Sequence, residues 1–499
     1  MKINERTNGG RTSRWPLLEP PVQRPKVHTP SLLRRRPWHV LEAPTGEFPA
    51  VDAEEAMGPQ LPDEATVNFV LDLSLRLGEV QMASGAGASD VTATIIAIAG
   101  ALGLPHCEVD VIFTSITVTC HRGSELSPIT ALRVVRSRSL DYTRLTETEK
   151  LIRQIVRGNV GAEQAQTELE RITSAPHPYP RWTATLAWGG LAAFITILLG
   201  GGFDVALVAF VISAAIDRLG RLLNRYSLPF FFQQVVGGLF ATLSAMAIVS
   251  SGMMTTDRPT LVVAAAVTVL LSGLSTVSAV QDAITGYNVT AAGRTMETAL
   301  MSAGLIAGVV LALRIAVLLE LPLTPLPEIT GSTPQQLPLI VLGGAGASAC
   351  FALASYAKLR ATLVAAAAGA IGAAVYGSLM VAQLDGVSSS AVAATLVGFC
   401  GGVLARRLGV TPLVVAVSGI TPLLPGLSTY RGLYQIGVEP GGNISTLMTA
   451  VAIGLALAAG VVLGEWLAQP VRTGLGRLER RFAGPRMAGP LEPTERSLE

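Results

Sequence analysis

Long apolar runs with few charges fill the chain from Trp182 onward. A helix that crosses a bilayer needs about 20 mainly apolar residues, and runs of this length follow one another with short gaps. The pattern predicts a multi-pass α-helical membrane protein. Its breaks indicate about ten spans, near residues 182–200, 203–217, 229–250, 260–281, 295–319, 337–357, 360–381, 388–405, 411–427 and 444–468.

A different pattern precedes these runs, between Asp63 and Pro178. Apolar residues at helical spacing predict an amphipathic helix to about Ala83, followed by a second helix that stops near Gly103. Strand-like runs and two further helices come next, the strands at 107–113, 115–121 and 129–137 and the helices at 146–158 and 161–173. This stretch therefore predicts a compact α+β domain.

Helix boundaries in this domain have recognisable signals. Gly85 and Gly87 in the segment SGAGASD are expected to break the first helix, and Ser89 or Asp90 can cap the second. Thr146, with Glu149 three residues later, predicts the start of the third helix.

Composition supports the membrane assignment and divides the chain. Half of the 499 residues are hydrophobic and only 14% are charged, which excludes an ordinary soluble enzyme. The net charge of +2 says little about partners, because the charges are segregated along the chain, and no nucleic-acid partner is expected. Residues 1–62 have the composition of a disordered basic tail, and no apolar core follows Arg34–Arg36, so no signal peptide is expected. The four cysteines show no metal-ligand or disulfide spacing, and no metal or cofactor is expected.

Arginines and lysines are divided unequally between the two sets of loops. One set holds only Arg258 and Arg431, and its longest loop, Glu320–Gln336, has no basic residue. Because cytoplasmic loops carry the excess of positive charge, both termini and the α+β domain are expected in the cytoplasm. The basic residues of the other loops and of the C-terminal tail are Arg218, Arg221, Arg225, Arg294, Lys358, Arg360, Arg406, Arg407, Arg472, Arg477, Arg480 and Arg481.

Short segments recur in the membrane half at a nearly constant offset of 152–154 residues. An offset of this length contains about five spans, and an odd number turns the second copy upside down. Inverted repeats are typical of secondary transporters, whose substrate sites lie between the repeats. The matching segments are Gly189-Gly190 with Gly343-Gly344, Pro259 with Pro412, Gly273–Thr276 with Gly426–Thr429, and Ala307–Leu311 with Ala459–Leu463.

The second copy interrupts an apolar run whose equivalent in the first copy keeps Gly273 and continues to Gln281 and Asp282. Pro422 and Pro425 lie within the second copy, and proline at membrane depth is tolerated where the freed backbone groups face protein or a cavity. Such groups, with nearby hydroxyls, can hold an amino or carboxylate group, although the prolines can equally be simple kinks between packed helices. The candidate residues of this segment are Thr421, Pro422, Pro425, Ser428, Tyr430 and Arg431.

Charged residues at the end of the matching run in the first copy are the second group of candidates. Charge at the edge of a membrane segment is costly and indicates function. Asp282 and Glu297 are both candidate proton carriers, and Asp282 is the favoured one. Arg294 can bind a substrate carboxylate or pair with Asp282 or with Glu297, three residues away. The candidates of this segment are Gln281, Asp282, Asn288, Arg294 and Glu297.

The α+β domain also holds residue types that a hydrolase would use, namely Ser89, Asp90, His106 and Asp110. The segment SGAGASD lacks the strand–turn–helix setting of a nucleophile elbow. A glycine-rich turn between two helices explains it better, so we expect no catalytic residue and regard a membrane-tethered hydrolase as a distant alternative.

Several long segments resemble the threonine/serine exporter family, over about Val67–Trp466. They are LPFFFQQVVGG (228–238), QDAITGYNVTAAGR (281–294), VGFCGGVLARR (397–407), ITPLLPGLSTYRGLY (420–434) and AAGVVLGEW (458–466). The resemblance implies an inner-membrane exporter of small hydroxylated amino acids that is driven by the proton gradient. It also implies about ten spans behind a cytosolic domain, and members split into two chains near residues 320–336.

The expected protein is therefore a proton-coupled antiporter that exports L-threonine and L-serine across the bacterial inner membrane. An exporter of small dicarboxylates such as succinate is the alternative. The partners are a small amino acid, protons and the lipid bilayer, with a homo-oligomer left open. The expected divisions are 1–62 as a disordered tail, 63–178 as a cytosolic α+β domain, 179–325 and 326–470 as two inverted five-span repeats, and 471–499 as a cytosolic tail.

Overall fold

The computed structural model describes residues 63–473, apart from 105, 123–125, 137–139, 252–258, 272, 321–332, 406–407 and 439–443. The predicted disordered tail at 1–62, most of the predicted C-terminal tail and most of the loop without basic residues lie outside the described residues. Two parts of the chain are described below. The N-terminal part comprises helices α1–α4 and strands β1–β3, and the helical part comprises α5–α16.

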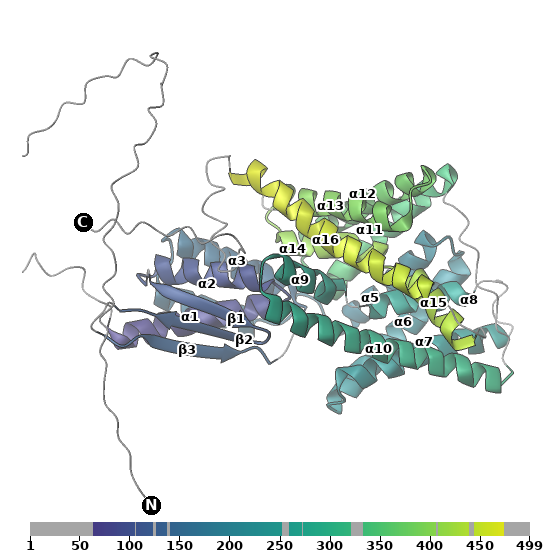
Figure 1. The fold of residues 1–499 in the computed structure, drawn as a ribbon, viewed down its shortest axis with the longest axis horizontal. Coiled ribbons are helices and arrows are strands. Elements are labelled where there is room, and N and C mark those ends of the chain that lie inside the picture. The colour runs from purple at the N-terminus through teal and green to yellow at the C-terminus, as the bar shows by residue number, and fades with distance from the viewer. Residues whose placement is uncertain are drawn as a thin grey trace, which may run out of the picture. The chain divides into compact units, whose positions relative to one another are not determined.

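A three-stranded antiparallel sheet forms one layer of the N-terminal part. Strands β1 (Cys107–Ile112), β2 (Ser115–Cys120) and β3 (Ile129–Val134) pair in that order. Each strand lies within a strand-like run that the sequence predicts. Ile116 and Val118 of β2 are buried on one face. Helices α1 (Glu64–Ala83) and α2 (Ala88–Ala101) cover that face (Figure 1), because the apolar faces of the helices and of the sheet are buried from water against each other.

Helices α3 (Tyr142–Val156) and α4 (Ala162–Ser174) form a further layer against α1 and α2. Leu77 of α1 and Ile155 of α3 are fully buried in the core between them. The prediction that Thr146 begins this helix is wrong. The carboxylate of Asp141 caps α3 by accepting the Arg144 amide at 2.9 Å, while the Thr146 hydroxyl donates to the Tyr142 carbonyl within the helix.

The helical part contains twelve α-helices among the described residues. Six are long and apolar enough to cross a membrane, and two bent pairs raise the number to eight, as in a multi-pass membrane protein. α5 and α6 lie where the other two of the ten predicted spans are expected, and the count of ten stays a prediction. The helices are α5 (Arg181–Leu198), α6 (Phe203–Arg225), α7 (Phe230–Ser250), α8 (Pro259–Leu270), α9 (Gly273–Ile284), α10 (Asn288–Leu318), α11 (Leu337–Ala354), α12 (Leu359–Val381), α13 (Gly386–Leu404), α14 (Pro412–Ile420), α15 (Gly426–Val438) and α16 (Ser445–Thr473).

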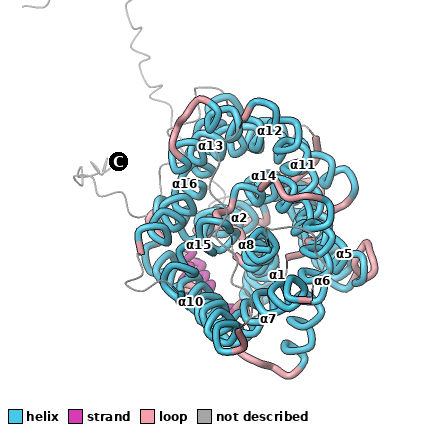
Figure 2. Tube along the Cα trace, turned by 90° about the vertical axis from the view of Figure 1, so that its right-hand side faces the viewer, coloured by secondary structure: helices cyan, strands magenta, loops and turns pink. Residues whose placement is uncertain are grey.

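Two predicted spans are each built from two helices that meet at a bend. α8 and α9 meet at 48°, and α14 meets α15 at 46° after a short 3-10 turn at Thr421–Leu423. Seen end on, α8, α14 and α15 lie inside a ring of the other helices (Figure 2). Every residue from Leu261 to Val267 is accordingly buried.

The two halves of the helical part repeat the same packing. α7 packs on α10 and α13 packs on α16, each pair through a glycine at matching repeat positions. Gly308 lies against the Val235 carbonyl, and Gly460 lies against the Ala391 carbonyl. Small residues allow helix backbones to approach this closely in membranes. The matching helices α5 and α11 also pack on each other between the halves.

Candidate functional site

A buried ion pair lies where α9 ends and α10 begins. The Arg294 Nη1 atom is 2.9 Å from the Asp282 carboxylate, and the two side chains are 3% and 0% exposed. Arg294 thus pairs with one of the two carboxylates that the sequence allowed. A buried ion pair is stable only when hydrogen bonds satisfy its remaining polar atoms.

The N-terminal part supplies such hydrogen bonds. The amide of Ala88, the first residue of α2, donates to Asp282 Oδ1 at 2.6 Å, and Arg294 Nη2 donates to the Ala86 carbonyl at 3.1 Å. The Asp282 carboxylate therefore caps the N-terminus of α2, because a helix N-terminus attracts negative charge. The prediction that Ser89 or Asp90 caps this helix is wrong, since Gly87 is the N-cap residue and makes no side-chain cap.

Two more hydrogen bonds join the segment 84–90, which we call the SGAGASD loop, to α9. Gln281 Nε2 donates to the Asp90 carboxylate at 2.9 Å, and the Ser278 hydroxyl donates to the Gly85 carbonyl at 2.8 Å. Gly85 has a φ of +96°, and a Cβ atom there would lie 2.5 Å from Leu274. Glycine is required at this position for both its backbone angle and the close approach of α9.

The β1–β2 hairpin contacts the start of α10. The Phe113 amide donates to the Thr290 hydroxyl at 3.0 Å, and that hydroxyl donates to the Val111 carbonyl at 2.9 Å. Phe113 has a φ of +53°, an unfavourable angle for a bulky residue, and its ring lies on Gly293. Together with the SGAGASD loop, the hairpin forms what we call the first junction, between the N-terminal part and the α9–α10 corner (Figure 1).

The candidates of the second copy surround the break between α14 and α15. Thr421 and Pro422 are buried in the 3-10 turn, where the Thr421 hydroxyl donates to the Val417 carbonyl at 2.8 Å. Pro425 and Ser428 are half-buried, Tyr430 is fully buried, and Arg431 is half-buried one residue further along α15. Gly426, the first residue of α15, lies directly on Thr268 of α8.

The structure thus places the predicted residues in two separate groups. Gln281, Asp282 and Arg294 lie together at the first junction. Ser428, Tyr430 and Arg431 lie on α15, which meets α8, α10 and α16, while Thr421 and Pro422 lie in the 3-10 turn, which meets α11 and α12. Asn288 is exposed at the start of α10, and Glu297 is half-buried one turn after Arg294. That all of these form one site stays a prediction.

The four residues considered for hydrolysis are dispersed. His106 and Asp110 are exposed before and within β1, and Ser89 lies in the first turn of α2. Asp90 accepts from Gln281. Among the described residues, no hydrogen bond joins Ser89, His106 and Asp110 into a nucleophile–base arrangement.

A second junction, which the sequence did not indicate, joins α3 to the second half. Tyr142 and Leu145 are buried within the core of the helical part, with the Tyr142 ring 6.3 Å from that of Phe351. Backbone and side-chain bonds tie the same region to the α11–α12 connection and to the start of α14. They are Tyr142 amide to Ser355 carbonyl at 3.0 Å, Thr143 hydroxyl to Tyr356 carbonyl at 2.6 Å, Lys358 to Glu147 at 2.6 Å, and Thr146 to Thr411 at 3.3 Å.

Comparison with known proteins identifies the family. The profile described as "Putative threonine/serine exporter" matches residues 72–316, and that described as "Threonine/Serine exporter, ThrE" matches residues 341–467. A protein of Mycobacterium tuberculosis named "Probable threonine/serine exporter" is 39% identical over 435 residues, which cover 86% of this chain and 81% of that protein. The chain belongs to the threonine/serine exporter family.

Other relatives agree with this assignment and extend it. The "Threonine/serine exporter" of Corynebacterium glutamicum is 35% identical over 438 residues, covering 86% of this chain and 89% of that protein. A "Probable succinate transporter subunit" of Klebsiella aerogenes is 24% identical over 259 residues, covering 50% of this chain and 95% of that protein. No solved structure matches the chain. The family resemblance read from the sequence is confirmed.

Proposed function

We propose that this member of the exporter family moves L-threonine and L-serine out of the cytoplasm in exchange for protons. The names of the two relatives that align over 86% of the chain carry the choice of substrate. The bent pairs α8–α9 and α14–α15 support a transport pathway, because interrupted helices at the interface of two repeats form the substrate sites of many secondary transporters.

The two halves would be inverted repeats, and the junctions with the N-terminal part support this. In the first half, α9 reaches the N-terminal part with its last residues, at Asp282. In the second half, the matching bent pair reaches it with its first residues, at Thr411. Likewise α5 begins, and its match α11 ends, at a hollow lined by Arg181 and Tyr356. Matching helices would therefore run in opposite directions.

The N-terminal part would lie in the cytoplasm. The basic residues Arg181, Arg221 and Lys358 gather on the side of the helical part that faces it, and cytoplasmic loops carry such an excess. The relative named as a subunit, which aligns over nearly its whole length with half of this chain, fits a fusion of two half-transporters.

Asp282 would carry the proton. As a carboxylate, it holds both Arg294 and the N-terminus of α2. Protonation would remove the charge that both groups attract, and charge-assisted hydrogen bonds are about twice as strong as neutral ones. Proton binding would thus loosen the SGAGASD loop from α9 and α10 and open the cytoplasmic end of the pathway to the amino acid.

Everted membrane vesicles test the proposed function. With an acidic lumen, vesicles that contain the protein should accumulate labelled threonine and serine, and collapsing the pH gradient should abolish this uptake. Uptake that is unaffected by the pH gradient would refute proton coupling. The absence of threonine and serine uptake would refute the assigned substrates. Succinate is included because of the third relative's name.

A further inference from the structure

A small hollow of about 210 Å³ lies at the second junction, where α3, the end of α4 and the start of α12 meet. It is smaller than the roughly 300–1,000 Å³ of pockets for drug-sized ligands, and so suits a ligand with few heavy atoms. Its charged lining contains both signs, since Arg144, Arg171 and Lys358 are basic and Asp141 and Glu147 are acidic.

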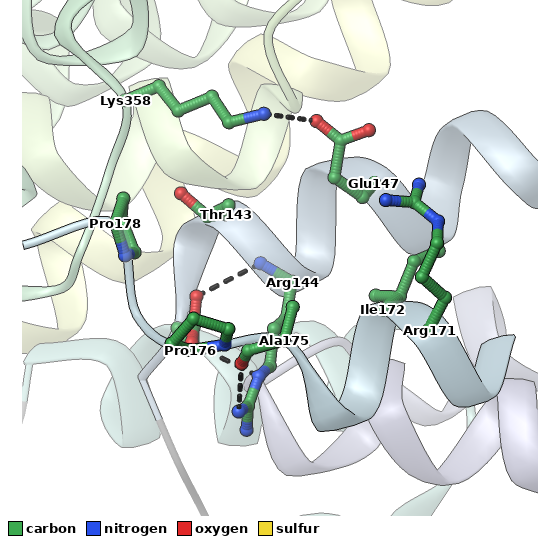
Figure 3. A pocket seen from close by; sticks show the side chains of 10 residues that line it. Thr143, Arg144, Glu147, Arg171, Ile172, Ala175, Pro176, Pro178 and Lys358 are labelled. Carbon is green, nitrogen blue, oxygen red and sulfur yellow. Dashed lines mark hydrogen bonds and ion pairs between the residues drawn. The ribbon is translucent and has the colours of Figure 1, made fainter. Parts of the chain in front are cut away.

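Charges of opposite sign are concentrated around Glu147. Lys358 Nζ lies 2.6 Å from the Glu147 carboxylate, and Arg171 lies beside it from α4 (Figure 3). Burial alone would raise the pKa of Glu147, but hydrogen bonds from Lys358 and Lys150 outweigh this effect and hold the pKa below its ordinary value. The carboxylate is therefore ionised at neutral pH. Lys358 and Arg171 are the two basic residues that lie beside it in the lining of the hollow.

The rest of the hollow is apolar or already satisfied. Ile172, Pro176 and Pro178 supply hydrocarbon surface. Arg144 is held by the Ala175 carbonyl at 3.0 Å and by Asp141 at 3.4 Å. Lys358 pairs with Glu147, and Arg171 pairs with Glu168 of its own helix, but these side chains are long and partly exposed, so Lys358, Arg171 and Glu147 can turn towards a ligand.

We propose that this hollow binds a free amino acid in its zwitterionic form, at a second site apart from the transport pathway. The ligand carboxylate would lie between Lys358 and Arg171, its ammonium group would donate to Glu147, and its side chain would lie against Ile172 and Pro178. The choice of threonine and serine as ligands rests on the proposed function. A dicarboxylate fits less well, because it offers no donor to Glu147 and adds negative charge beside it.

Such a site would act on the junction itself. The Lys358–Glu147 pair joins residues 211 positions apart and ties the N-terminal part to the start of α12. An amino acid that binds both ends replaces this direct tie with a bridge through the ligand. Occupancy would then change how firmly the N-terminal part is held on the second half, so the cytoplasmic amino-acid concentration could regulate export.

Equilibrium binding of labelled threonine to the full chain in lipid nanodiscs tests the proposal. The unaltered protein should show two classes of site, one of which succinate displaces poorly. Arg171→Gln and Glu147→Gln should each weaken that class by about tenfold to a hundredfold, since hydrogen bonds to charged groups contribute roughly 1.5–3 kcal/mol. Arg171 is bonded to Glu168 of its own helix, so its removal breaks no described bond to the second half.

Lys150→Gln is the matched control. Lys150 also pairs with Glu147, at 3.1 Å, but it does not line the hollow, and its loss should leave both classes unchanged. One class of site in the unaltered protein, or two classes that both survive Arg171→Gln and Glu147→Gln, would overturn the proposal. So would succinate that competes as well as threonine. A protein that binds threonine in this hollow yet transports none would refute only the proposed function.

Discussion

The carboxylate of Asp282 accepts a hydrogen bond from the backbone amide of Ala88, with 2.6 Å between Oδ1 and the amide nitrogen, although the two residues are 194 positions apart in the sequence. A helix N-terminus in the N-terminal part is thus capped by a residue at the end of a bent membrane-span candidate. The same carboxylate pairs with Arg294, whose other nitrogen reaches the Ala86 carbonyl. One titratable group therefore connects α2, α9 and α10.

Replacing Asp282 with asparagine should abolish uptake driven by the pH gradient in everted vesicles, while the protein still inserts in the membrane. The amide can accept a hydrogen bond from Ala88, but it neither gains nor loses a proton near neutral pH, and it removes the carboxylate that pairs with Arg294. Breaking a buried ion pair costs about 3–5 kcal/mol, so the thermal midpoint should also fall.

A double variant separates these two effects. Asp282→Asn with Arg294→Gln removes both charges, and it should recover stability without recovering proton coupling. Asp385→Asn is the control, because Asp385 also accepts helix amides but does so at an exposed N-cap. Normal gradient-driven export by the double variant would exclude Asp282 from the mechanism.

Replacing Gly85 with alanine should detach the SGAGASD loop from α9. The residue has a φ of +96°, and the new methyl group would meet Leu274. The backbone angle alone costs about 1–2 kcal/mol, and overpacking adds roughly 1–3 kcal/mol. Gly103→Ala is the matched control, with a φ of +91° and open space around it. Equal falls in the thermal midpoint of the two variants would contradict the close contact.

Local features of the fold could be predicted from the sequence. The three strands follow from alternating residues, and the helices from apolar spacing, because both patterns record burial in neighbouring residues. The long motifs around Gln281–Arg294 and Ile420–Tyr434 were sufficient to identify the family. Gly308 and Gly460 occupy matching positions of the sequence repeat, and each lies where two helices pack closely, α10 on α7 and α16 on α13.

The junctions could not be predicted in the same way. Spacing along one helix left Arg294 with two possible carboxylates, and only the folded chain brings Asp282 to Ala88. Tyr142 reads as an ordinary residue near a helix start, although its ring is buried in the core of the helical part. Contacts between residues more than a hundred positions apart leave no periodic signal in a single sequence.

Replacing Gly426 with alanine should reduce export by about tenfold or more. Gly426 begins α15 and lies directly on Thr268 of α8, so a methyl group would push apart the two bent pairs. Overpacking of this kind typically costs about 1–3 kcal/mol. Uptake by everted vesicles and the amount of folded protein in detergent should be measured together.

Two further variants sharpen that measurement. Thr268→Ala should restore only part of the export lost in Gly426→Ala, since it removes the hydroxyl closest to the new methyl group but leaves the Ala264 carbonyl, 2.7 Å from it. Gly454→Ala, in α16 with open space around it, should be tolerated, because alanine favours a helix by about 1 kcal/mol over glycine. If Gly426→Ala exports normally, the contact between α8 and α15 does not control the pathway.

Single cysteines at Asn159 and Glu320 should be labelled from opposite sides of the membrane. Asn159 lies between α3 and α4, and Glu320 lies two residues after the end of α10, on the side away from the first junction. Because the basic loops favour a cytoplasmic N-terminal part, an impermeant maleimide should label only Glu320→Cys in intact cells and only Asn159→Cys in everted vesicles. The four natural cysteines set the background and are replaced by serine in a control. The reverse pattern would place the N-terminal part outside the cell, and the first junction would then open to the wrong compartment for export.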